Sequence, residues 1–231
     1  MHQEDTILNI PSRGVQASGE PFRAIYARDS WTLGSGPGSL RNLNAPFSEF
    51  LERFIRDNKI FKIVDFGCGD WQWMSGVDLN ETNYYGFDVV DEVLAKNTSK
   101  YKRQNVCFDR TPENVADLTE GDLILFKDVL IHLPNAYVSE LLACARRKFR
   151  FILAVNNFSE EPSDYNGEIE FGGFRPVDLA RPPFSMHCAT VLRYGKLRVV
   201  DPRLPWIVAI LRRRFVWPGI KHVQLAFGER A

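Results

Sequence analysis

The chain has 231 residues, of which 45% are hydrophobic and 13% aromatic, enough to bury the core of one α/β domain. Its 29 basic and 29 acidic side chains give a formal net charge of zero, which argues against a dedicated duplex-DNA binder. The first residues lack the basic and then apolar pattern of a secretory signal, and the apolar run 206–211 is far too short to cross a bilayer. These features favour a cytoplasmic protein.

The four cysteines are spread along the chain and form no C-x-x-C pair: Cys68, Cys107, Cys144 and Cys188. This spacing favours reduced, buried thiols over a disulfide framework or a zinc site. The histidines also lack ligand-like partners at close spacing, so we expect no bound metal.

The first thirty residues are polar and are predicted to be irregular. They lead into a glycine-rich loop, Trp31 to Ser39, which is not a P-loop because no strand precedes it. The loop is either a flexible lid over a site or a solvated connector. A helix is predicted next, since Pro46 suits a first turn and five apolar residues share one helical face. These residues are Phe47, Phe50, Leu51, Phe54 and Ile55.

Strands and helices then alternate, which predicts a parallel sheet with right-handed crossovers. The predicted strands are 59–64, 84–88, 105–109, 122–126 and 151–155, and the predicted helices are 93–101 and 134–149. Beyond Asn157 the alternation stops. Two further strands, 189–193 and 221–227, are expected to close the sheet around a helical or irregular insertion at 205–215.

We therefore expect a single α/β domain in three parts. Residues 1–44 form an N-terminal segment with the glycine-rich lid, residues 45–160 a cofactor-binding core, and residues 161–231 a substrate-side and C-terminal segment.

The first predicted strand runs directly into the turn Asp65-x-Gly67-x-Gly69. Glycines here permit positive φ and a close approach of the backbone to a ligand. A strand followed by such a turn is typical of a site for a nucleotide-like cofactor at the edge of a parallel sheet. The Asp65 carboxylate suits a ligand with a positive charge or hydroxyls, which points away from a dinucleotide.

Two carboxylates follow the next strands. Asp88 ends the second strand, where it can accept both hydroxyls of a cofactor ribose; the alternative is a cap on the helix starting near Asp91. Asp109, after the third strand, is the candidate acceptor for an adenine amino group; the alternative is an ordinary turn residue.

The fourth strand ends in Lys127-Asp128, with His132 four residues beyond Asp128. At the carboxyl ends of parallel strands a crevice opens, so Asp128 and His132 should face the place where cofactor and substrate meet. A neutral His132 can take a proton from a substrate hydroxyl. The alternative is a structural histidine that is hydrogen-bonded beneath the following helix.

Two arginine-containing segments complete the candidates. Arg175 lies in a glycine-rich setting and can bind a carboxylate or phosphate bidentately; the alternative is a pair with Asp178 in a structural turn. The run Arg212 to Arg214 flanks apolar and aromatic residues, which allows weak contact with an anionic membrane surface; the alternative is a core helix with a solvated end.

On these motifs the chain resembles class I S-adenosylmethionine-dependent methyltransferases, and particularly a bacterial branch of small members, several of them near glycan or secondary-metabolite genes. The resemblance runs from Trp31 to about Phe184. Its markers are the loop 35–39, the turn 68–70 with Trp73, and the segments 85–88, 127–133 and 174–179. One departure is Trp71, which stands where the superfamily often has a third glycine.

The resemblance implies a Rossmann-like fold, a mostly parallel sheet with a C-terminal antiparallel strand, and S-adenosylmethionine as cofactor. It implies that residues of the glycine turn line the methionine part, that Asp88 holds the ribose, that Asp109 lies near the adenine, and that Asp128 stands beside the sulfonium. The turn residues are Asp65, Gly67, Gly69 and Asp70. Trp73 and Arg175 are expected on the substrate side, and Asp128 and His132 are the expected catalytic pair.

The expected function is O-methylation of a small polar metabolite or a glycan. Alternatives are N-methylation of a small molecule or protein side chain, and a non-catalytic module that binds the cofactor. A nicotinamide oxidoreductase is disfavoured because the chain lacks a G-x-G-x-x-G turn. The C-terminal segment would allow contact with the inner membrane face, and the sequence leaves the oligomeric state open.

Overall fold

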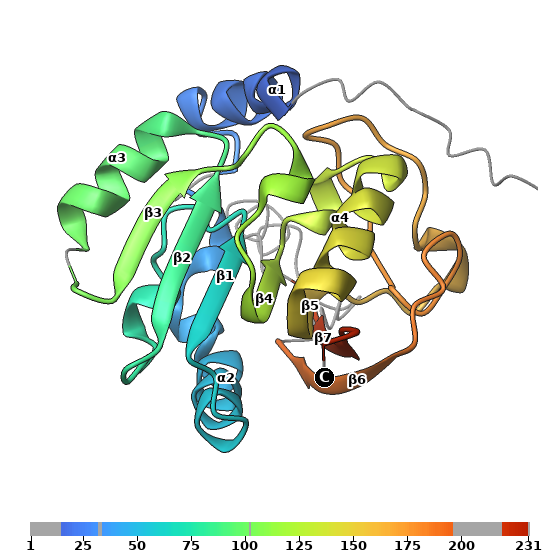
Figure 1. Cartoon of the computed structure of the whole chain (residues 1–231). Helices are drawn as coiled ribbons and strands as arrows, with labels where there is room; N and C mark the ends of the chain where they lie inside the picture. The colour runs from blue at the N-terminus through green and yellow to red at the C-terminus, as the bar shows by residue number, and fades with distance from the viewer. Residues whose placement is uncertain (1–14, 32–33, 102, 196–218, 231) are drawn as a thin grey trace, which may run out of the picture.

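A computed structural model describes residues 15–31, 34–101, 103–195 and 219–230 (Figure 1). Its centre is a seven-stranded sheet with the order β3-β2-β1-β4-β5-β7-β6. The strands are β1 Lys62–Phe66, β2 Asn83–Asp88, β3 Val106–Arg110, β4 Gly121–Lys127, β5 Phe149–Asn157, β6 Cys188–Tyr194 and β7 Lys221–Phe227. The α-helices of the described ranges are α1 Val15–Ala27, α2 Ala45–Asp57, α3 Asp91–Lys100 and α4 Asn135–Lys148.

Strands β1 to β5 run parallel, and β7 lies antiparallel between β5 and β6. All the strands predicted from the sequence are present, with bounds that differ by a few residues. The order reverses between β1 and β4, so the carboxyl ends of these two strands diverge into a crevice. The insertion expected at 205–215 and the arginine run beyond Leu211 lie outside the described residues.

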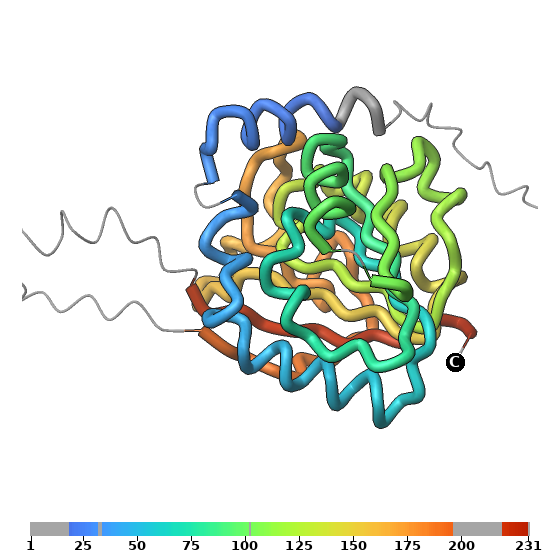
Figure 2. Tube along the Cα trace, turned by 90° about the vertical axis from the view of Figure 1, so that its left-hand side faces the viewer, coloured from blue at the N-terminus to red at the C-terminus, as the bar shows by residue number. Residues whose placement is uncertain are grey.

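Both faces of the sheet are buried, which explains why its central strands are almost continuously apolar. Along β4, Leu123 and Leu125 face one core together with α2, whereas Ile124 and Phe126 face a second core with α4. Figure 2, turned by 90° from Figure 1, shows the helices on either side of the sheet. The predicted apolar face of α2 is confirmed: Phe47, Leu51, Phe54 and Ile55 are buried in it, and Phe50 is half-buried against the same core.

The N-terminal segment differs from the prediction, because residues 15–27 form helix α1 rather than irregular structure. Gly19 and Pro21 lie inside this helix and lower its intrinsic propensity, so local sequence argues against it. Tertiary packing compensates. Phe22 and Tyr26, one turn apart, both contact Trp31, with ring centroids 6.2 and 5.5 Å away.

The cysteines also differ in part from the expectation of four buried thiols. Cys68 and Cys144 are buried and Cys188 is half-buried, but Cys107 is exposed. It lies on β3, the edge strand of the sheet, whose faces are only partly covered. Across the described ranges, no helix combines the length and apolar character needed to cross a bilayer.

Candidate functional site

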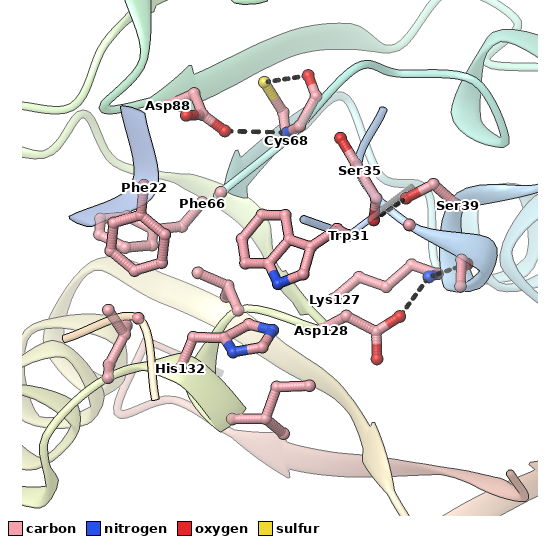
Figure 3. Close-up of a pocket in the computed structure, with 18 of the residues that line it drawn as sticks. Phe22, Trp31, Ser35, Ser39, Phe66, Cys68, Asp88, Lys127, Asp128 and His132 are labelled. Carbon is pink, nitrogen blue, oxygen red and sulfur yellow. Dashed lines mark hydrogen bonds and ion pairs between the residues drawn. The ribbon is translucent and has the colours of Figure 1, made fainter. Parts of the chain in front are cut away.

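A cavity of about 460 Å³ opens at the carboxyl ends of β1, β2 and β4 (Figure 3). Several parts of the chain line it: helix α1, the glycine-rich loop, the turn after β1, the segment after β4 and the start of β7. Of the site residues predicted from the sequence, the cavity brings together Asp65, Gly67, Gly69, Trp73, Asp88, Asp128 and His132. It does not include Asp70, Asp109 or Arg175.

The turn after β1 requires its two glycines. Gly67 and Gly69 have φ of 79° and 55°, and a Cβ would lie 2.5 Å from Val129 at the first and 2.6 Å from Ser35 Oγ at the second. Trp71, in place of a third glycine, adopts φ 56° and is fully buried. Its indole packs on three rings away from the cavity, those of Tyr84, Tyr101 and Phe108. The bulky residue therefore leaves the turn open to a ligand.

Asp65 is a buried carboxylate with one oxygen to spare. Its Oδ2 accepts a hydrogen bond from the Tyr84 hydroxyl at 2.5 Å, whereas Oδ1 has no partner among the described residues. Burial raises the pKa of Asp65 to about 7. A positively charged or hydrogen-donating ligand would satisfy this oxygen and favour the ionised form.

Asp88 connects the glycine turn to the start of α3. One of its oxygens accepts from the backbone N–H of Gly69 and the other from that of Val90, both at 3.0 Å. Burial raises its pKa. The Val90 bond resembles the capping alternative, but Asp88 also lines the cavity. Because a carboxylate oxygen can accept more than one hydrogen bond, both oxygens keep capacity for a ligand.

Asp70 lies outside the cavity and instead fastens the glycine-rich loop. Its Oδ2 accepts from Ser35 N at 3.0 Å, and its own N–H donates to Ser35 Oγ at 2.8 Å. Ser35 Oγ also lies 2.6 Å from the Tyr26 hydroxyl. The three residues join α1, the loop and the turn after β1, and Gly36 to Gly38 of the loop then line the cavity. The loop therefore lies against the cavity rather than serving only as a solvated connector.

Asp109 is exposed on β3, where its Oδ1 accepts from the N–H of Arg110 at 2.7 Å. The prediction ended the strand at Asp109, but β3 continues to Arg110. The polar residue that follows the strand into the cavity is Thr111, which is buried and donates its N–H to the Asp88 carbonyl at 2.9 Å.

Arg175 is buried and holds backbone rather than facing the cavity. Its guanidinium donates to the carbonyls of Leu130 and Leu133 and to Asn135 Oδ1. The alternative pair with Asp178 is also absent, since that carboxylate accepts from Arg181 at 3.0 Å. Both interpretations of Arg175 were therefore wrong: its guanidinium joins the carbonyls at the two ends of the segment 130–133, so the arginine fixes the turn after β4.

His132 ends that turn, the 3₁₀ segment Leu130–His132, and its ring lies tilted against that of Trp31, with the ring centroids 4.9 Å apart (Figure 3). Its Nδ1 lies 2.6 Å from the Gly173 carbonyl, which can only accept, so we assign the proton to Nδ1. Burial lowers the pKa of His132 and favours the neutral ring. In that tautomer Nε2 carries the lone pair, as a proton acceptor requires.

Asp128 follows β4 with a φ of 56° and forms ion pairs with Lys127, at 2.7 Å, and Lys221. Burial alone would raise the pKa of Asp128, but the two ammonium groups outweigh it and hold the pKa at about 2. Sequence reasoning missed Lys221 because it lies 93 residues away on another strand. Trp73 belongs to the same end of the cavity, since Lys127 Nζ lies 5.4 Å from its ring centroid.

Comparison with known proteins identifies the fold. No protein-family model matches the sequence, and neither does any curated protein. Among solved structures, the N-methyltransferase NodS from Bradyrhizobium japonicum WM9, in complex with S-adenosyl-L-homocysteine, has a TM-score of 0.59 at 10% identity, covering 93% of this chain and 99% of that chain.

Two further structures are similar over nearly their whole length. Magnesium protoporphyrin IX methyltransferase (ChlM) from Synechocystis PCC 6803, with bound SAM, has a TM-score of 0.56 at 11% identity, covering 98% of this chain and 100% of that chain. The DhpI–SAM–HEP complex has a TM-score of 0.54 at 17% identity, covering 94% and 100%. At such identities the likeness is one of fold. The chain has the Rossmann-like fold of S-adenosylmethionine-dependent methyltransferases, which confirms the predicted fold class.

Proposed function

We propose that this protein is an S-adenosylmethionine-dependent methyltransferase that methylates an oxygen atom of a small polar metabolite or a glycan. The observation that carries the proposal is the unpartnered Asp65 oxygen, which is buried beside two glycines of positive φ in the cavity. A ligand with neither a positive charge nor a hydrogen-bond donor would leave this oxygen unpaired, whereas the ammonium group of a methionine part would pair with it.

The other lining residues fit the same cofactor. The Asp88 oxygens have capacity for the two hydroxyls of a ribose, and Thr111 takes the place near the adenine that the sequence assigned to Asp109. Gly67 and Gly69 let the backbone approach the methionine part. The SAM and S-adenosylhomocysteine complexes of the similar structures support this assignment.

When bound, S-adenosylmethionine would supply a methyl group on a sulfonium: a lone pair of the acceptor oxygen would attack the methyl carbon in line, and the C–S electron pair would leave with the sulfur of S-adenosylhomocysteine. The protein has to align the acceptor, exclude water and remove the hydroxyl proton. Trp31 and Phe22 cover the cavity, and His132 Nε2 receives the proton. Asp128 is a poor base because its pKa is about 2, so we assign it a charge-positioning role instead.

Calorimetric titration with S-adenosylhomocysteine tests the proposal. We expect saturable binding that Asp88→Ala weakens at least about tenfold, because hydrogen bonds to a charged group are lost. Asp109→Ala is the matched control: it removes a carboxylate outside the cavity and should leave the affinity unchanged. NADH should not bind. Folded wild-type protein that fails to bind S-adenosylhomocysteine would overturn the proposal.

N-methylation is the second candidate, favoured by the likeness to the N-methyltransferase NodS. An amine acceptor loses its proton more easily than a hydroxyl, so it depends less on His132. Activity that survives His132→Asn, with a pH optimum that follows the amine, would select this alternative. A folded protein that binds the cofactor but turns over no acceptor would instead be the non-catalytic module.

A further inference from the structure

Two buried lysines from different strands share one carboxylate in the cavity. Lys127 at the end of β4 and Lys221 at the start of β7 are 7% and 6% exposed, and both pair with Asp128. Two ammonium groups against one carboxylate leave this lysine cluster with an excess positive charge. A buried charge without a partner is unfavourable, so the cluster favours an additional anion.

Each ammonium also has hydrogen-bonding capacity left. Lys127 Nζ donates to the Gly38 carbonyl at 2.9 Å and to Asp128, while Lys221 Nζ donates to Asn157 Oδ1 at 2.7 Å and to Asp128. An ammonium has three N–H donors, so within the described part of the chain one donor of each lysine is open. Burial lowers the pKa of Lys221, and Asp128 opposes that effect. A second anion would favour the charged form further.

The lysine cluster lies on the acceptor side of the cavity. In Figure 3, Lys127 and Asp128 lie beside His132 and Trp31, away from Asp88 and Cys68. The glycine-rich loop covers the cluster: a Cβ at Gly38 would lie 3.1 Å from Asp128 Oδ2 and 4.0 Å from Lys221 Nζ. Both lysines line the cavity, and Lys127 lies away from Asp88.

We propose that the methyl acceptor is an acid, with a carboxylate or phosphate group that Lys127 and Lys221 bind in the cavity. The proposal rests on the proposed methyltransferase function and narrows its substrate class. Anchoring the anionic group there would leave another group of the acceptor to meet His132. The two lysines thus take the anion-binding role that the sequence suggested for Arg175, whose guanidinium is engaged with backbone.

The test uses inorganic phosphate and acetate as probes on protein saturated with S-adenosylhomocysteine, at constant ionic strength. Tryptophan fluorescence is the readout, because Lys127 Nζ lies over the Trp73 ring. We expect a saturable change that Lys221→Met weakens at least about tenfold, since it removes one charged donor, while Lys221→Arg retains most of the affinity. Lys96→Met, an exposed lysine on α3, is the matched control and should behave as wild type.

The cofactor also carries a carboxylate, so the experiment has to distinguish an anion of the acceptor from the carboxylate of the cofactor. If phosphate competes with S-adenosylhomocysteine and Lys221→Met weakens S-adenosylhomocysteine instead, the lysines bind the cofactor and the proposal is wrong. Absence of saturable phosphate or acetate binding by the wild type would also overturn it. If the wild type does not bind S-adenosylhomocysteine, the proposed methyltransferase function is wrong. Titration of the ligand-free protein with phosphate and acetate then still tests whether the lysines bind an anion. Lys127→Met replaces Lys221→Met if thermal denaturation shows the latter to be unfolded.

Discussion

Asp65 is a buried carboxylate that lowers the stability of the folded protein at neutral pH. Its carboxylate is 1% exposed, and among the described residues only one of its oxygens has a hydrogen-bond partner. Desolvation disfavours the charged form, which is why its pKa is raised to about 7 from an ordinary value of 3.8. The folded protein without a ligand therefore binds a proton that the unfolded chain releases in neutral solution.

This difference predicts a pH-dependent stabilisation in Asp65→Asn. A group whose pKa is raised on folding stabilises the folded protein fully at pH values below its pKa in the unfolded chain. That stabilisation is lost as the pH rises through its pKa in the folded protein. Between pH 5 and pH 8 the wild type should lose about 3 kcal/mol of unfolding free energy through this group. The variant should not, and histidine effects cancel in the comparison. Urea denaturation of both proteins at the two pH values measures the difference, with Asp109→Asn as the control. An equal pH dependence in wild type and Asp65→Asn would contradict the assignment.

His132 predicts a pH profile of activity. Burial lowers its pKa, so the neutral base is already present at neutral pH and is lost only as the pH falls through that lowered pKa. His132→Asn keeps an N–H for the Gly173 carbonyl but removes the base. With a hydroxyl acceptor we expect the rate to fall by about 10²- to 10⁴-fold and the acidic limb of the profile to disappear. S-adenosylhomocysteine affinity should stay within about twofold, because the variant keeps the turn. Retention of the acidic limb in the variant would show that another group titrates.

At the scale of elements, Ser35 links helix α1, the glycine-rich loop and the turn after β1 through two contacts of one hydroxyl. Its Oγ meets the Tyr26 hydroxyl of α1 and the N–H of Asp70 in the turn after β1. Because the cavity lies beneath this loop, fastening it should order the binding site as well as the fold.

Ser35→Ala is predicted to loosen the loop. It removes both Oγ contacts but keeps the backbone bond from residue 35 to Asp70, so we expect a loss of about 1–2 kcal/mol in unfolding free energy. Amide exchange of Ser39 and Leu40 should accelerate at least about fivefold. Ser139→Ala, an exposed serine on α4, should change neither quantity. Unchanged exchange in Ser35→Ala would mean that the loop is held by other contacts.

The sequence predicted the elements whose local signals agree with the fold. Helix α2 has a proline in its first turn and one apolar face, and the strands of the parallel sheet are short apolar runs. Helix α1 was missed because Pro21 opposes it locally, and the contacts that stabilise it come from outside the helix, among them those with Trp31 and Ser35.

The same distinction applies to the site. Asp65 and Asp88 line the cavity, as expected for carboxylates near the ends of strands at the crevice. Asp109 lies outside the cavity, on a strand that extends one residue further than predicted. Arg175 lies outside it because its guanidinium binds backbone carbonyls, which sequence spacing does not reveal. Lys221 gave no signal, since lysines are rarely buried and β7 reaches the site only after the chain has reversed direction.

At the scale of the molecule, β7 connects the end of the chain to both the site and the sheet. Lys221 at its first position joins the lysine cluster, and its last part runs beside the start of β5. Beyond the strand, the N–H of Gly228 donates to the Arg150 carbonyl and that of Glu229 to the Arg146 carbonyl. The chain end is therefore fastened where α4 passes into β5.

Gly228→Ala tests how much the fold depends on this attachment. A Cβ at Gly228 would lie 1.7 Å from the Phe149 carbonyl oxygen and 2.9 Å from that of Arg146, so backbone has to shift. We expect a loss of about 1–3 kcal/mol, the usual effect of overpacking, seen as a lower urea midpoint with an unchanged m-value. Gly219→Ala precedes the same strand and meets nothing within 4 Å, so it should leave the midpoint unchanged. If both variants unfold at the wild-type midpoint, the C-terminal attachment contributes little, and the position of Lys221 must instead depend on its ion pair with Asp128 and on the β5–β7 pairing.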